Sequence, residues 1–196
     1  WPMWLFYPPI IGFVLWKMVR HRSITMLTAV NPCMPASGLV YESKGDILSH
    51  LQKFGSPVGL FEVIPLEWDL EKKKTCLRGF MRDQSLSYPV VLKPDVGQRG
   101  QGVEVISSEE EAMRFFEAQK EDTVAQEFLP GREYGVFYYR YPNEEKGRVF
   151  SITDKRLMRV TGNGQSTLER LILTDERAVG MAKFFLEAYR QDLERV

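Results

Sequence analysis

A strand that runs directly into a glycine-rich loop sets the firmest limit on the fold. Residues 88–103 read YPVVLKPDVGQRGQGV, so an apolar run ends at Lys93 and is followed by Gly97, Gly100 and Gly102. Glycines carry no Cβ and adopt unusual φ angles at little cost, so the N–H groups of such a loop can approach an anion closely. A lysine at the end of the strand adds a positive charge beside them. The pattern predicts a phosphate-binding loop, with a β-hairpin that has a glycine-rich turn as the alternative.

The spacing of these glycines excludes two common nucleotide-binding motifs. A P-loop would continue with G-K-S or G-K-T, which this stretch lacks. The order G-x-x-G-x-G also differs from the dinucleotide-binding fingerprint G-x-G-x-x-G. A phosphate site built on this loop is therefore of another kind.

Hydrophobic periodicity along the rest of the chain predicts a mixed α+β protein. Helices are expected over 43–54, 67–83 and 109–119 and from Ser166 onward. Capping boxes open the last two, with Ser108 before Glu111 and Ser166 before Glu169. Strands are expected over 23–30, 58–64, 88–92, 102–106, 123–128, 134–141 and 148–153. Short turns separate the last three strands, which predicts an antiparallel meander over 123–153.

The charge balance and the cysteine content narrow the functional classes. The 196-residue chain has 26 Lys plus Arg and 26 Asp plus Glu. The resulting net charge of zero argues against a polybasic nucleic-acid-binding protein. Two cysteines without C-x-x-C spacing exclude a disulfide scaffold and a cysteine zinc site. With 44% hydrophobic and 27% charged residues, the sequence predicts a globular cytoplasmic protein with no nucleic-acid partner.

The first forty residues differ from the rest in charge. No Asp or Glu occurs from Trp1 to Tyr41, and residues 1–16 carry no charge at all. This apolar run is shorter than the roughly 20 residues that a membrane span needs, and positive charge follows it rather than precedes it. Residues 1–22 therefore suit a segment that contacts a membrane surface. A helix buried against another part of the protein is the alternative.

A second group of candidate residues lies in TVAQEFLPGREYGVF, residues 123–137. The segment QEFLPG follows a predicted strand, and its backbone N–H and C=O groups suit the edge of an adenine ring. Glu133 comes just past the turn, where its two oxygens can accept both ribose hydroxyls. Lys44, in ESKGDIL, starts a predicted helix. Each has a simpler interpretation, because Glu133 also suits an exposed strand carboxylate and Lys44 a solvated surface lysine.

These pieces, in this order and spacing, resemble the ATP-grasp superfamily, and in particular D-alanine–D-alanine ligase and related carboxylate–amine ligases. The resemblance runs from about Gly38 to Ile172. It implies two α+β subdomains that grip a nucleotide, with Lys44 and Lys93 on its phosphates and the loop Gly97–Gly102 as a lid. The adenine would meet residues of the QEFL segment, and Glu133 would hold the ribose. That segment comprises Gln126, Glu127, Phe128 and Leu129.

A further likeness to peptide-forming ATP-grasp ligases lies in DKRLMRVTGNGQSTLERLI, residues 154–172. In those enzymes a basic residue precedes a similar glycine turn and a capped helix. The resemblance implies that Lys155 or Arg156 lies near the transferred phosphate, where it would stabilise negative charge in the transition state. A solvated turn lysine at Lys155 and a plain helix cap at Ser166 are the alternatives.

The resemblance also implies a function and its reactants. It implies an ATP-dependent ligase that joins a small carboxylate to an amine through an acyl-phosphate. ATP and Mg²⁺ would be required, and we expect the metal ligands beyond Val196, since no matching Asp and E-x-N follow residue 172. A non-catalytic nucleotide-binding module attached peripherally to a membrane is the alternative function.

The expected domain organisation follows from the same resemblance. Residues 1–40 form an apolar segment and one strand, and residues 41–122 form the first ATP-grasp part with the lysine helix and the lid. Residues 123–196 form a second part that is incomplete at its C-terminal end. The fold class is therefore expected to be α+β of ATP-grasp type, incomplete at both ends.

Overall fold

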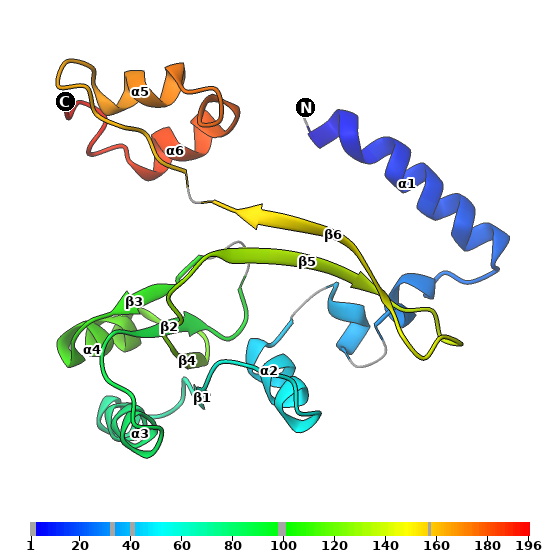
Figure 1. Cartoon of the computed structure of the whole chain (residues 1–196), viewed down its shortest axis with the longest axis horizontal. Helices are drawn as coiled ribbons and strands as arrows, with labels where there is room; N and C mark the ends of the chain where they lie inside the picture. Colours follow the sequence, from blue (N-terminus) through cyan, green and yellow to red (C-terminus); the bar gives the residue numbers. More distant parts are fainter. Residues whose placement is uncertain (1–2, 32–33, 40–41, 98–100, 157) are drawn as a thin grey trace. The chain divides into compact units, whose positions relative to one another are not determined.

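The computed structural model describes residues 3–31, 34–39, 42–97, 101–156 and 158–196. Its contacts divide the chain into two compact units, Trp1–Leu129 and Pro130–Val196. In the first unit the elements are α1 (Met3–Arg20), η1 (Met26–Ala29), η2 (Pro35–Gly38), α2 (Lys44–Lys53), β1 (Phe61–Ile64), α3 (Leu70–Asp83), β2 (Val90–Pro94), β3 (Glu104–Ile106), α4 (Glu109–Ala118) and β4 (Thr123–Glu127) (Figure 1). In the second they are β5 (Glu133–Tyr139), β6 (Arg148–Lys155), α5 (Leu168–Thr174), η3 (Val179–Met181) and α6 (Ala182–Ala188).

The first unit is built on a four-stranded antiparallel sheet in the order β1-β4-β2-β3. Lys93 of β2 is paired with Val124 of β4, and Val90 is paired with Ile106 of β3. Because side chains alternate between the two faces of a strand, Val90 and Leu92 share one face while Lys93 lies on the other. The sheet thus separates its apolar core face from the face that carries Lys93.

Two helices cover the core face of this sheet. Helix α3 contacts β1, α4 contacts β3, and the two helices contact each other (Figure 1). Apolar residues recur along both helices at the three- and four-residue spacing of one helical face. The core so formed contains Ile64, Leu77, Phe80, Met81, Val90, Leu92, Ile106, Ala112, Phe115, Phe116 and Ala125.

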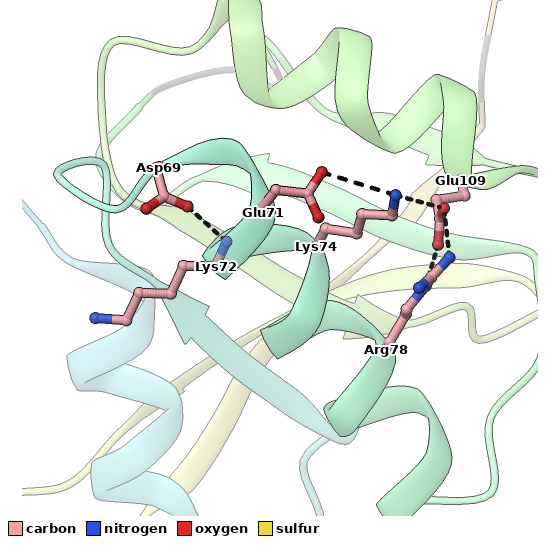
Figure 2. Close-up of polar contacts among 6 residues, drawn as sticks. All are labelled: Asp69, Glu71, Lys72, Lys74, Arg78 and Glu109. Atoms are coloured by element: carbon pink, nitrogen blue, oxygen red, sulfur yellow. Dashed lines mark hydrogen bonds and ion pairs between the residues drawn. The ribbon is translucent and has the colours of Figure 1, made fainter.

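Charged side chains link α3 to the start of α4 (Figure 2). The Glu109 carboxylate accepts hydrogen bonds from the guanidinium of Arg78 and lies 3.4 Å from the ammonium of Lys74. The bond to Arg78 is the main cause that lowers the pKa of Glu109. At the start of α3, Asp69 caps the helix by accepting from the Lys72 N–H at 2.8 Å. This part of the scaffold is polar outside and apolar inside, as two helices on a sheet require.

The second unit contains a hairpin and a small group of helices. Strands β5 and β6 are antiparallel, from the pair Glu133 and Lys155 to the pair Tyr139 and Arg148. A register shift after Phe137 marks an irregularity in the hairpin. Helix α5 packs with α6, and Ile172 and Ala178 are buried there.

The α+β class predicted from the sequence is confirmed, but two local predictions are wrong. Residues 23–30 contain the 3-10 helix η1 instead of a strand. Val, Ile and Thr favour strands only where a partner strand supplies a ladder, and none pairs with this segment among the described residues. Strand β4 is not part of a meander with β5, because it lies between β1 and β2. Burial of Val124 and Ala125 explains this central place.

The helix predicted from Ser166 onward is α5, and its cap lies one residue later than predicted. Thr167, and not Ser166, accepts the capping hydrogen bond, from the Arg170 N–H. Ser166 belongs to the preceding turn, where its N–H donates to the Asn163 Oδ1 at 2.8 Å and its Oγ accepts from the Asn163 amide. The asparagine side chain therefore organises the turn before the helix begins.

No helix in the described part of the chain combines the length and the apolar character that crossing a membrane requires.

Candidate functional site

The start of α2 is fixed against the segment that follows β2. Ser43 caps the helix by accepting from the Asp46 N–H at 3.0 Å. The next two backbone N–H groups reach Asp95: that of Lys44 donates to the carbonyl oxygen at 3.1 Å, and that of Gly45 donates to Oδ1 at 2.7 Å. A Cβ on Gly45 would lie 2.7 Å from Val63. The sequence therefore needs a residue without a side chain where α2 meets the sheet.

The Lys44 side chain reaches the first turn of the glycine loop. Its Nζ lies 2.9 Å from the carbonyl oxygens of both Pro94 and Asp95, and 3.3 Å from that of Gly97. An ammonium has three N–H donors, so these three contacts use all of them. In this arrangement Lys44 holds the loop, and it can contact a phosphate only by exchanging one of these carbonyls.

Lys93 lies beside this arrangement on the sheet face away from α3 and α4. Its Nζ donates to the Gln126 Oε1 at 2.6 Å, and the structure gives it no second hydrogen-bond acceptor among the described residues. Partial burial lowers the pKa of Lys93, the positive charge of Lys44 lowers it further, and Asp95 partly opposes both effects. Two lysines from distant parts of the sequence are thus close enough for the charge of Lys44 to disfavour that of Lys93. Nearby positive charges of this kind are typical of an anion site.

The loop glycines have different roles. Gly102 has φ +69°, and a Cβ there would lie 2.9 Å from Pro94, so this position requires glycine. At Gly97 a Cβ would meet nothing closer than 3.8 Å. Gly100 lies outside the described residues.

The predicted adenine segment lies at the end of β4. Gln126 is the partner of Lys93, as described above. Glu127, the last residue of β4, is bonded to the residue just before β1: its N–H donates to the Leu60 carbonyl at 2.9 Å, and its Oε1 accepts from the Leu60 N–H at 3.0 Å. Phe128 and Leu129 follow the strand and are exposed. The structure therefore brings Lys44, Lys93 and Gln126 together at one place in the first unit.

The other predicted residues lie together in the second unit. Glu133 begins β5 and Lys155 ends β6 in the paired register, and their side chains form an ion pair at 2.5 Å. Arg156 pairs with Asp154 at 2.6 Å. All four side chains line a cavity of about 600 Å³, together with Gly131, Arg132, Arg159 and Arg177. Five basic side chains against two acidic ones give this cavity a net positive charge of three.

Three of these arginines were not found by sequence reasoning. Arg132, Arg159 and Arg177 lie far apart in the sequence and belong to no recognisable spacing, so only the fold brings them together. Asp95 was also missed, although it directly follows the predicted Lys-Pro pair. In the described ranges, no three His, Cys, Asp or Glu side chains are grouped as a metal site would require.

Comparison with known proteins gives relatives that cover part of the chain. Cyanophycin synthetase from Trichormus variabilis is 30% identical over 122 residues, which cover 60% of this chain and 12% of that protein. The enzyme from Geminocystis herdmanii is 29% identical over 91 residues, 43% of this chain and 10% of its own length. Cyanophycin synthetases are ATP-grasp enzymes. The chain resembles the ATP-grasp ligases. The resemblance predicted from its motifs is therefore confirmed.

Solved structures that resemble the chain are ATP-grasp ligases as well. N5-carboxyaminoimidazole ribonucleotide synthetase, in its ADP complex, matches 76% of this chain and 38% of its own with a TM-score of 0.47 and 20% identity. D-alanine–D-alanine ligase from Helicobacter pylori matches over 81% of this chain and 48% of its own, with a TM-score of 0.40 and 18% identity. No protein-family model matches the sequence. The chain spans about a tenth of the length of the curated relatives.

Proposed function

We propose that this chain is the ATP-binding part of an ATP-dependent carboxylate–amine ligase that acts through an acyl-phosphate. One observation carries the proposal: Lys44 contacts the carbonyls that directly follow Lys93 at the start of the glycine loop, and partial burial together with the charge of Lys44 lowers the pKa of Lys93. A polyphosphate bound there would neutralise both charges and remove the repulsion between them. The similarity to cyanophycin synthetases over 60% of the chain supports the choice of a ligase.

In this proposal the residues of the first unit have distinct tasks. Lys93 binds a phosphate directly, because one Gln126 oxygen occupies only one of its three donors. Lys44 shapes the loop through its three carbonyl contacts, and the N–H groups of Gly97, Gly100 and Gly102 cover the phosphates. The backbone of Gln126–Leu129 binds the adenine edge.

In this proposal the second unit supplies charged side chains that bind the ribose and the transferred phosphoryl group. Glu133 accepts the ribose hydroxyls, and Lys155 and Arg156 stabilise the transferred phosphoryl group during formation of the acyl-phosphate. Both basic residues are now paired with carboxylates, so binding of a phosphate exchanges one anionic partner for another. The carboxylate and amine substrates are small molecules. No group of three His, Cys, Asp or Glu side chains occurs among the described residues, so no Mg²⁺ ligand is assigned to them.

Calorimetric titration of the whole chain with ATP tests the proposal. Lys93→Ala should weaken ATP binding at least tenfold, because a direct charge-assisted contact to phosphate is lost. Adenosine, which has no phosphate, should bind the variant and the parent chain equally. Titrations with and without Mg²⁺ separate binding by these residues from binding through the metal.

Lys53→Ala is the matched control, since Lys53 lies at the far end of the same helix as Lys44 and is exposed. It should bind ATP like the parent chain. Unchanged ATP affinity in a folded Lys93→Ala protein would refute the assignment of the phosphate site. Absence of saturable ATP binding by the folded parent chain would refute the proposed function for this chain.

A further inference from the structure

Helix α1 exposes an aliphatic stripe that the rest of the described chain leaves uncovered. It is an 18-residue helix, and none of its side chains from residue 5 to residue 20 is buried. Ile11, Leu15 and Val19 follow one another at four-residue intervals and are 54%, 56% and 78% exposed. Side chains at this spacing lie on one face of a helix. An exposed apolar stripe of this kind marks a surface that binds something apolar.

The opposite face of the same two turns is aromatic and basic. Phe13, Trp16, Lys17 and Arg20 share it by their spacing of three and four residues. The ammonium of Lys17 lies 5.4 Å from the ring centre of Phe13 and 5.1 Å from that of Trp16, and the Arg20 guanidinium lies 5.9 Å from that of Trp16. Trp and basic side chains are found at the headgroup level of a membrane interface, and exposed aliphatic side chains suit the acyl boundary below it.

Charge identifies the partner of this helix. From Trp1 to Tyr41 there is no Asp or Glu, and Lys17, Arg20 and Arg22 gather at the end of α1. The whole chain has a net charge of zero, so the excess of positive charge near α1 reflects where the charged residues lie along the chain and not a basic composition. A partner that contacts only the aliphatic stripe would not account for the positive charge at the C-terminal end of α1. Anionic lipid headgroups above an acyl layer match both features.

We propose that α1 lies in the surface of an anionic membrane. Ile11, Leu15 and Val19 enter the boundary of the acyl chains, and Trp16, Lys17 and Arg20 remain at the headgroups. On this proposal α1 lies parallel to the membrane surface. This proposal does not depend on ATP binding, because no residue of α1 takes part in the proposed nucleotide site.

Tryptophan fluorescence of the full chain gives a direct test. Of the four tryptophans, only Trp68 lies beyond residue 16, so Trp68→Phe leaves all the emission in the first sixteen residues. Vesicles of phosphatidylcholine and phosphatidylglycerol at 7:3 should shift this emission to shorter wavelength. Pure phosphatidylcholine vesicles should bind at least tenfold more weakly, and 0.5 M salt should weaken binding to the anionic vesicles. Co-sedimentation of the unsubstituted chain serves as a second measurement.

Two variants separate the apolar and the charged contributions. Leu15→Glu with Val19→Glu should reduce vesicle binding at least tenfold, and Lys17→Glu with Arg20→Glu should abolish the preference for anionic vesicles. Leu51→Glu is the control, since Leu51 is also a partly exposed helical leucine, 41% exposed in α2, and it should bind like the parent. Equal binding to both kinds of vesicle, or binding to neither, overturns the proposal. A wavelength shift that grows with protein concentration in the absence of vesicles also overturns it, because a second copy of the chain then covers the stripe.

Discussion

The two regions that hold the candidate residues are built in different ways. Lys44 contacts backbone carbonyls, and the Gly45 N–H donates to the carboxylate of Asp95, which is only 8% exposed. Beside them, Lys93 donates to the side chain of Gln126. Around Glu133 and Lys155 the contact joins two side chains that are 67% and 59% exposed. Exposed ion pairs are weakened by solvent screening and cost the entropy of ordering two long side chains, so they contribute little to stability and hold the local structure only weakly. The first region is therefore a preformed scaffold, whereas the second is a set of charges that a ligand can rearrange.

The largest effect on stability should come from filling the space at Gly45. In Gly45→Val the new side chain would overlap Val63 and crowd the Asp95 carboxylate, 2.7 Å and 3.2 Å from the position of a Cβ. Overpacking of this kind costs about 2 kcal/mol, and the N–H bond to Asp95 would be strained as well. Urea denaturation should show a lower midpoint, and ATP binding should weaken because the start of α2 moves away from the loop.

Gly79→Ala is the matched control, because Gly79 is also helical and a Cβ there would meet nothing within 4 Å. It should stabilise the protein by about 0.5 to 1 kcal/mol, the helix preference of alanine over glycine. If Gly45→Val and Gly79→Ala shift the urea midpoint alike, the junction of α2 and the loop is not the preformed scaffold described here.

An intermediate effect is expected at Lys93, where a substitution should weaken ATP binding without lowering the free energy of unfolding. Lys93→Met removes a partly buried positive charge next to Lys44, so it should not lower stability at pH 7.5, although it should abolish the phosphate contact. The parent chain should become more stable relative to the variant as the pH rises from the lowered pKa of Lys93 toward its ordinary 10.5. In that window the unfolded chain binds more protons than the folded one, which makes the free energy of unfolding rise with pH.

Urea denaturation of both proteins between pH 7.5 and 10.5 measures this difference. Lys53→Met, at an exposed lysine of α2, should show no such trend relative to the parent. A clear loss of stability in Lys93→Met at pH 7.5 would contradict this prediction and would mean that Lys93, through Gln126, is part of the scaffold itself.

Local structure in the first unit follows closely from the sequence, because it depends on neighbouring residues. Ser108 is the cap that its position predicts, and α3 ends at Asp83 as the amphipathic pattern indicates. Strand pairing does not follow in the same way. The place of β4 between β1 and β2 depends on burial of Val124 and Ala125 against distant elements, which no local pattern reveals.

The candidate site shows the same division between local and long-range information. The place of Lys93 near the end of a strand could be predicted, because strand, lysine and loop are consecutive in the sequence. The convergence of Lys44 on the carbonyls after β2 could be expected only through the family resemblance, since it depends on a contact far along the chain. The arginines at 132, 159 and 177 could not be predicted, because the cavity that collects them arises from the folding of the second unit.

The smallest effect is expected at the ion pair of Glu133 and Lys155. A double-mutant cycle of Glu133→Gln and Lys155→Met should give a coupling of about 0.5 kcal/mol or less in urea denaturation, because both side chains are mostly exposed. The comparison pair is Glu144 and Arg148 in the turn region of the same hairpin, at 2.8 Å and with one partner less exposed, which should couple at least as strongly. A coupling above about 1.5 kcal/mol at the first pair would place it beyond the range of exposed ion pairs. The second region would then be as preformed as the first, and a ligand phosphate could not exchange with Glu133 at low cost.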